Sequence, residues 1–350
     1  NAEIDQAGAG LSASWVLYDF GARDAALDNA LQSLAASRHT QDATLQKVFL
    51  SAVQAYYNLF ANRAAVDSAL EAERRAQESL KAAVARYEAG TGTPADRLQA
   101  QTAYSQAVLN RVQAEGTVKS AEGTLANTMG NDANRVPAIA APAMNMPDTK
   151  FEQGLDELIA AARQRRPYLA AADAQVRAAL ANVDAARAAG MPTLSLSTSM
   201  NYADSDIGNP ARSQALGVTL NIPAFSGFGT TYRVQAAQAQ AASQAAQRDS
   251  LSQQVALDVW QAYYALNTGT QAVRSSADLV TSAAESERVA LGRYRAGVGN
   301  IIDVLTAQSS LASARLQYIQ AAYNWQVART TLAQTMGQLD LSAVDALRRP

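Results

Sequence analysis

A turn motif occurs twice in this chain, as RYEAGTGTPADRL at residues 86–98 and as RYRAGVGNIIDVL at residues 293–305. The same separation of 207 residues (293 minus 86) relates QAYYNL at 54–59 to QAYYAL at 261–266, and TLANTMG at 124–130 to TLAQTMG at 331–337. Because the separation is constant over these three pairs, two segments of about 11–130 and 218–337 share one plan. The chain is therefore an internal duplication.

Each copy has the pattern of a strand, a very long helix, a tight turn and a second long helix. Residues 22–89 contain neither glycine nor proline, and as one helix they would span about 100 Å. In the second copy, Gly269 and Gly292 are expected to bend or break the corresponding helix. Alanine-rich faces suit helices that contact neighbours on both sides. We predict helices at about 22–89, 95–129, 229–295 and 301–337.

The segment between the copies has a different pattern. Pro137, Pro142 and Pro147 exclude a helix and indicate an extended linker. A short helix at about 151–165 and another at 168–189 should follow. The predicted organisation is a single unit of two repeats: repeat 1 at 1–130, a linker with a short equatorial helix at 131–166, repeat 2 at 167–337, and a C-terminal tail at 338–350.

The two helical turns have cap chemistry. Gly90 and Gly297 suit the left-handed residue that ends a helix. Thr93 and Asn300 then serve as N-caps. Asp96 and Asp303 occupy the third position of the next helix, where a carboxylate favours the helix start by about 0.3–1 kcal/mol.

Three segments alternate with a period of two and predict strands at about 8–18, 193–202 and 214–223. About ten residues is the length that a tilted strand needs to cross a bilayer, and aromatic residues cluster near the strand ends, as in a membrane-interface girdle. A polar loop is expected at 203–213. The alternative is a hairpin that packs on helices in water. Subtracting 207 places the partners of the 168–189 helix and the 193–202 strand before Asn1, so a complete protomer is expected to have four strands.

Composition limits the function classes. With 29 basic and 31 acidic residues and a net charge of -2, no basic tract supports nucleic-acid binding. The absence of cysteine excludes disulfides and thiolate chemistry. His39 is the only histidine, which leaves no metal site and no nucleophilic triad. No apolar run reaches 18 residues, the start has no signal-peptide pattern, and we expect neither a cofactor nor an enzyme activity.

The second turn motif, followed by TLAQTMG at 331–337, resembles the C-terminal signature of the TolC outer-membrane efflux and type I secretion family. The likeness covers nearly the whole chain, and the duplication fits it. The resemblance implies a mainly α fold with a small β part: a long α-helical barrel of hairpins joined to antiparallel transmembrane β-barrel strands, in a homotrimer. It further implies a channel-tunnel that extends from the outer membrane of a Gram-negative bacterium into the periplasm. Such a channel exports small molecules or proteins, docks a periplasmic adaptor, works with an inner-membrane ABC or proton-driven transporter, and contacts outer-membrane lipid.

The resemblance also assigns residues. Asp303 matches a lumen-facing aspartate at the periplasmic constriction, where three copies would form a carboxylate ring. Thr306 stands where well-known members have a second aspartate, and Gly299 where they have an arginine that locks the closed tip. Tyr294 matches a tyrosine of the closed-state network, so a weaker or differently held gate is expected. The adaptor-docking tips are Gly90, Thr91, Gly92, Gly297, Val298 and Gly299.

Two other interpretations compete with these. The chain could be a non-membrane periplasmic helical adaptor or a coiled-coil scaffold, although no β-rich adaptor domain accompanies the hairpins. At the residue level, Asp303 could serve only as a helix-capping carboxylate, and the tips could be ordinary exposed turns. Asp96 is expected to be a cap alone.

Overall fold

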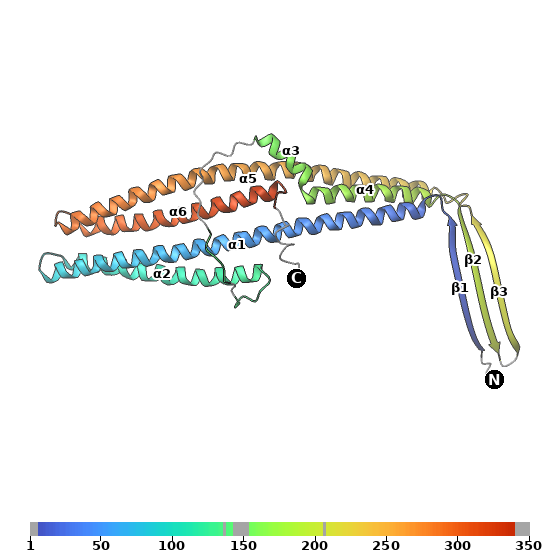
Figure 1. Ribbon diagram of the computed structural model, residues 1–350, viewed down its shortest axis with the longest axis horizontal. Coiled ribbons are helices and arrows are strands. Elements are labelled where there is room, and N and C mark those ends of the chain that lie inside the picture. The colour runs from blue at the N-terminus through green and yellow to red at the C-terminus, as the bar shows by residue number, and fades with distance from the viewer. Residues whose placement is uncertain (1–5, 136–137, 143–153, 206–207, 340–350) are drawn as a thin grey trace. The chain divides into compact units, whose positions relative to one another are not determined.

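The computed structural model describes residues 6–135, 138–142, 154–205 and 208–339 of the chain (Figure 1). Six helices and three strands form within these ranges, and none of these helices combines the length and apolar character of a membrane span. In chain order they are β1 (Gln6–Tyr18), α1 (Ala22–Glu88), α2 (Pro94–Thr128), α3 (Leu155–Arg165), α4 (Pro167–Ala188), β2 (Thr193–Ser205), β3 (Gly208–Asn221), α5 (Gly229–Arg295) and α6 (Ile301–Thr335).

The helix bounds repeat with the separation found in the sequence. Helices α1 and α5 have 67 residues each and begin at Ala22 and Gly229, again 207 apart. Helices α2 and α6 have 35 residues each and begin at Pro94 and Ile301. The prediction of a mainly helical chain with a small antiparallel β part is confirmed.

Glycine does not interrupt the second long helix. Helix α5 continues from Gly229 to Arg295, so the expectation of a break at Gly269 or Gly292 is wrong. A Cβ at Gly269 would lie 3.5 Å from the Trp325 Cα, and the Trp325 indole donates to the Thr270 hydroxyl at 3.1 Å. The small residue therefore allows α5 and α6 to approach closely, and this contact offsets the low helix propensity of glycine.

The predicted loop at 203–213 is largely strand. Ala203 pairs with Ala211 and Tyr202 pairs with Arg212, which leaves only a short connection between β2 and β3. Pro210 has no paired residue on β2, because the register shifts between Ala203 and Ser205, and proline is tolerated at such an irregularity. Parts of other predictions fall outside the described residues, namely Pro137, Pro147, the start of the 151–165 helix and most of the 338–350 tail.

The chain forms two compact units, and α1 and α5 each contribute to both. The first contains residues 1–42 and 167–253. In it, α4 buries an alanine-rich face, and Asn29 of α1 donates to the Ala178 carbonyl of α4 at 2.7 Å. These units combine parts of both repeats, so the division into two repeats with a linker stays a prediction.

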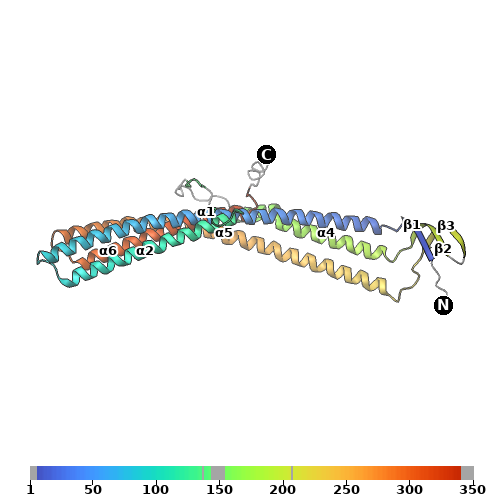
Figure 2. The ribbon, with the colours of Figure 1, turned by 90° about the horizontal axis from the view of Figure 1, so that it is seen from below.

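The second unit contains residues 43–166 and 254–350. In it, α1 and α2 form one antiparallel hairpin and α5 and α6 another, side by side (Figure 2). Leu59 and Leu125 form the buried centre of the first hairpin, and their repeat partners Leu266 and Leu332 lie in the core of the second. Helix α3 covers the second hairpin through Leu158, whereas residues 138–142 contact the first, where the Tyr56 hydroxyl donates to the Ala140 carbonyl at 2.8 Å.

Candidate functional sites

The three strands form an antiparallel sheet in the order β1-β2-β3, with one apolar face. The register places Leu11 opposite Met200 and Trp15 opposite Leu196, and Leu196 opposite Val218. These side chains alternate outward on one face because neighbouring residues of a strand point to opposite sides. Leu11 is 71% exposed, Trp15 64% and Leu216 76%. The described part of the chain does not cover this face.

The other face of the sheet carries small and polar side chains. Ser199, Ser197 and Ser195 of β2 lie opposite Ala215, Gly217 and Thr219 of β3. Ser12 and Ser14 of β1 continue the same face. A sheet with one exposed apolar face and one small polar face is typical of strands between lipid and a water-filled lumen.

The strands lead into the long helices through matched junctions. Phe20 and Gly21 both have positive φ, and so do Gly227 and Phe228, their repeat partners. At the first junction, the buried Asp19 carboxylate accepts from the Arg23 side chain at 2.8 Å and from its backbone N–H at 3.2 Å. Because Asp19 satisfies the first turn of α1, the strand can change directly into a helix.

The first hairpin tip has a complete cap. Gly90 adopts φ +72°, and the Thr91 and Gly92 N–H groups both donate to the Arg86 carbonyl at 2.9 Å. The Thr93 hydroxyl then accepts from the Asp96 N–H, and the Asp96 carboxylate accepts from the Thr93 N–H, both at 3.1 Å. This is a capping box, so the predicted capping role of Asp96 is confirmed.

The second tip has the same backbone but a different cap. Gly297 adopts φ +80°, and the Asn300 side chain accepts from the Ile302 N–H at 3.0 Å. A Cβ at Gly299 would lie only 2.9 Å from the Tyr294 nitrogen. No L side chain fits there unchanged, so the turn itself requires glycine at this position. Gly90, Thr91, Gly297 and Val298 are exposed.

Arg86 joins the two tips. Its guanidinium donates to the Tyr294 carbonyl at 3.1 Å and lies over the Tyr294 ring, with Cζ 4.6 Å from the ring centroid. Tyr294 is buried with Ile301 and Val304. We call this contact between α1 and the end of α5 the Arg86–Tyr294 clasp.

Asp303 and Thr306 line one open groove between α5 and α6. Both side chains are exposed, and the groove has a volume of about 570 Å³. Arg293 and Glu285 line the same groove. Within the described residues, the Asp303 carboxylate makes no hydrogen bond or ion pair, in contrast to Asp96. The two aspartates at equivalent positions of the repeats therefore differ: Asp96 closes a capping box, whereas Asp303 is available to solvent and ions.

Sequence reasoning missed two participants. It did not identify Arg86 as the partner of Tyr294, although the duplication aligns Arg86-Tyr87 with Arg293-Tyr294. In the first repeat Tyr87 is exposed and carries Arg97 over its ring at 4.8 Å. The repeat therefore indicates that each tip has an arginine next to a tyrosine in the sequence, but it does not indicate which arginine contacts which tyrosine in the fold. Arg293, beside Asp303, was the second residue missed.

Comparisons with known proteins agree with this architecture. The family described as "Outer membrane efflux protein" matches residues 1–131 and 158–338. Protein CyaE of Bordetella pertussis is 33% identical over 337 residues, covering 95% of this chain and 71% of that protein. Outer membrane protein TolC of Escherichia coli is 25% identical over 330 residues, covering 89% of this chain and 66% of that protein.

Solved structures show the same fold. A membrane protein from Pseudomonas aeruginosa superposes with a TM-score of 0.83 at 23% identity, covering 96% of this chain and 84% of that one. The chain thus spans 66–84% of the length of these three proteins. The likeness extends over both the sheet and the helical hairpins.

Proposed function

The chain belongs to the outer membrane efflux protein family and is an outer-membrane channel subunit, and from this premise we propose that three copies assemble into a tunnel for export. The tunnel would carry small molecules or proteins from the periplasm to the outside. It would work with a periplasmic adaptor and with an inner-membrane transporter that supplies the energy, and it would catalyse no reaction. The family match removes the ground for the alternative of a periplasmic adaptor or scaffold.

The observation that carries this proposal is the two-faced sheet. Leu11, Trp15, Leu216 and Val218 form an apolar face that the described chain leaves exposed, and the opposite face is lined by serines. Exposing such a face to water is unfavourable by about 25 cal/mol per Å². Outer-membrane lipid against the apolar face would remove it from water, and an aqueous lumen would hydrate the polar face.

Fractionation of two matched variants tests the membrane part. Val218→Arg places a charge on the apolar face, which should cost about 2–4 kcal/mol near the bilayer midplane. Thr219→Arg places the same charge on the polar face, one residue away. The amount of Val218→Arg recovered in the outer membrane should fall several-fold, while Thr219→Arg stays near wild type. Equal recovery of both variants would contradict the assignment of the two faces.

We further propose that the second tip forms the gate. Asp303 and Thr306 face an open groove at the start of α6, and Tyr294 is held by the Arg86–Tyr294 clasp, which would keep the tips together in a closed state. The exposed tip residues Gly90, Thr91, Gly297 and Val298, with the half-buried Gly92 and Gly299, would meet the adaptor. Variants of Asp303 and Arg86 test the gate through cation block of the channel and through its conductance.

A further inference from the structure

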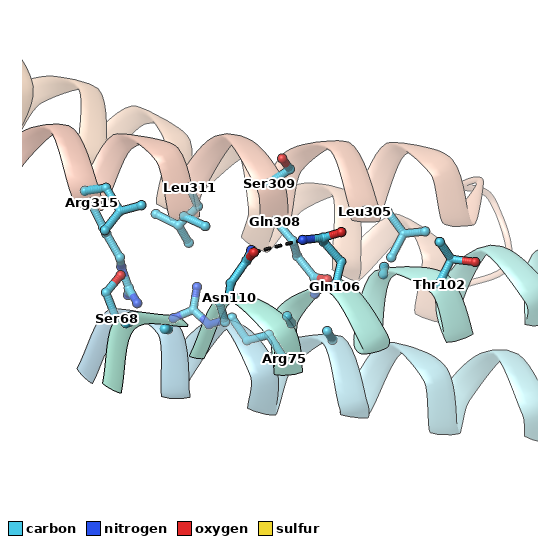
Figure 3. Close-up of a pocket in the computed structure, with 18 of the residues that line it drawn as sticks. Ser68, Arg75, Thr102, Gln106, Asn110, Leu305, Gln308, Ser309, Leu311 and Arg315 are labelled. Atoms are coloured by element: carbon cyan, nitrogen blue, oxygen red, sulfur yellow. Dashed lines mark hydrogen bonds between the residues drawn. The ribbon is translucent and has the colours of Figure 1, made fainter. Parts of the chain in front are cut away.

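A separate cleft lies in the second unit, between α1, α2 and α6 (Figure 3). Its volume is about 870 Å³, within the range of sites for organic molecules. The wall combines leucines and alanines with the side-chain amides of Gln106, Asn110 and Gln308. The internal duplication and the proposed roles of the hairpin tips do not account for the residues that line this cleft.

Two arginines reach into the same cleft. Arg75 comes from α1 and Arg315 from α6, and Figure 3 shows both guanidinium groups at the end of the cleft near Ser68. Both side chains are half-buried. Across the described residues, neither makes a hydrogen bond or an ion pair. Two half-buried cations that form no ion pair are unfavourable for the free protein and favourable for a bound anion.

The neighbouring carboxylates offset the charge of this pair only in part. Glu71 and Glu287 act on Arg315 without forming an ion pair with it, and Glu71 is already bound by Arg74 at 3.1 Å. Glu287 keeps its charge, because its partner at 3.4 Å is the neutral Gln308 amide, so two arginines face one unpaired carboxylate. Burial and the nearby Arg75 lower the pKa of Arg315 from its ordinary value. Arginine nevertheless remains charged in proteins, so the positive charge of the cleft persists at physiological pH.

The residues that line the cleft around the arginines indicate the chemistry of the rest of the ligand. Leu98, Leu305, Leu311 and Leu316 supply apolar surface in the same cleft. Asn110 and Gln106 bond to each other at 2.9 Å, and each keeps further donor and acceptor capacity. A planar guanidinium matches the two oxygens of a carboxylate, sulfonate or phosphate group.

We propose that this cleft binds an organic anion, with the acidic group between Arg75 and Arg315 and an apolar body against the leucines. The site is distinct from the groove at Asp303, which carries a free carboxylate and lies between α5 and α6. Its occupant is a small molecule of one acidic group and one aromatic or aliphatic body.

Calorimetry with the intact chain in detergent tests this site, using naphthalene-1-sulfonate as the probe and detergent without protein as the blank. We expect saturable binding of one probe per chain. Arg75→Gln and Arg315→Gln should each weaken binding by about tenfold or more, because each removes a charge-assisted bond. Arg329→Gln, an exposed arginine of α6 outside the cleft, should bind like wild type.

Thermal stability separates a ligand site from a structural role. If the arginines repel each other in the empty cleft, Arg315→Gln should melt at or above the wild-type temperature and lose the stabilisation that the probe gives. A lower melting temperature without the probe would show a structural role and overturn the proposal. So would binding that is equal in Arg75→Gln, Arg315→Gln and Arg329→Gln.

Two further probes define the ligand class. Naphthalene-1-methanol lacks the charge, and inorganic sulfate lacks the apolar body, so both should bind at least about tenfold more weakly than the sulfonate. Tight binding of the alcohol would overturn the role of charge, and tight binding of sulfate would overturn the role of the leucines. No saturable binding of any probe would overturn the site itself, including the case in which another copy of the chain fills the cleft.

Discussion

Gly299 shows how a single residue can fix the shape of a turn. A Cβ there would lie 2.9 Å from the Tyr294 nitrogen and 3.0 Å from the Arg293 carbonyl carbon, both of them backbone atoms that cannot move alone. The family resemblance led us to expect an arginine here, and glycine is required by the close approach of the turn to the end of α5. A sequence contains no interatomic distances, so this reason is apparent only in the folded structure.

Gly299→Ala should therefore destabilise the second tip by more than about 1 kcal/mol. Gly116→Ala is the matched control, because Gly116 lies in the exposed interior of α2 with open space around its Cα. That change should raise stability by about 0.5–1 kcal/mol through helix propensity. Melting temperatures of the two variants should move in opposite directions, and a parallel change would contradict the close contact at Gly299.

The Arg86–Tyr294 clasp makes a second residue-level prediction. Arg86→Ala removes a cation–π contact and a hydrogen bond, which together hold the tips by about 1–2 kcal/mol. If the clasp keeps the tunnel closed, single-channel conductance in a planar bilayer or the fraction of time spent open should rise several-fold.

Arg97→Ala is the control for the clasp. It removes the arginine over the Tyr87 ring within the first repeat, without breaking a contact between the tips. Its conductance should equal that of wild type. If both variants conduct alike, the clasp does not hold the gate.

At the scale of elements, two carboxylates join the helices of the first hairpin, Glu73 of α1 through Arg111 and Glu122 of α2 through Arg63. Glu122 of α2 accepts from Lys119 at 3.0 Å and from Arg63 of α1 at 3.2 Å. The hydrogen bonds from Lys119 and then Arg63 hold its pKa below the ordinary value of 4.5. A carboxylate with a lowered folded-state pKa stabilises the fold above its unfolded pKa, and that stabilisation is lost as the pH falls through the folded value.

Wild type should therefore lose stability between pH 7 and about pH 3, and Glu122→Gln should lose less over that interval. The difference should be about 1–3 °C in melting temperature, because Arg63 and Lys119 remain partly exposed to solvent. Glu88→Gln provides the control, since Glu88 is exposed and has no ion pair within the described chain. A pH response of Glu122→Gln equal to that of wild type would contradict the role of this carboxylate.

Element boundaries were largely predictable because their signals are local. Proline at the first helical position, asparagine or threonine at the cap and glycine after the last turn mark each end of the hairpins. The exceptions depend on contacts between elements. Gly269 stays helical because Trp325 packs on it, and the 203–213 segment becomes strand because β2 and β3 pair along it.

At the scale of the whole molecule, the twin aspartates allow a test of the proposed tunnel. In a trimer, three copies of Asp303 would form a negative ring at the constriction, and Arg293 in the same groove would weaken it. Asp303→Asn should therefore reduce block of the channel by multivalent cations, whereas Arg293→Gln should increase it. The measurement is bilayer current against cation concentration.

Asp96→Asn is the internal control, because Asp96 occupies the same position of the first repeat but closes a capping box. It should lower stability by about 0.3–1 kcal/mol, through the loss of the negative charge at the helix start, and leave cation block unchanged. If the Asp96 and Asp303 variants changed cation block of the channel equally, Asp303 could not be treated as the pore residue and Asp96 as a cap alone. The sequence paired these aspartates and predicted that Asp96 is only a cap, and the hydrogen bonds of Asp96 give the physical reason for the difference.

The equal helix lengths also limit how this protein can evolve in size. An insertion of seven residues in α1 alone, beyond Leu59, would move the first tip by about 10 Å and separate Arg86 from Tyr294. The hairpin would stay in register only if α2 gained the same length, and the two tips would stay together only if α5 and α6 did so too. A lineage that lengthens or shortens its reach must therefore change four helices in step, so indels in this family should occur in matched sets.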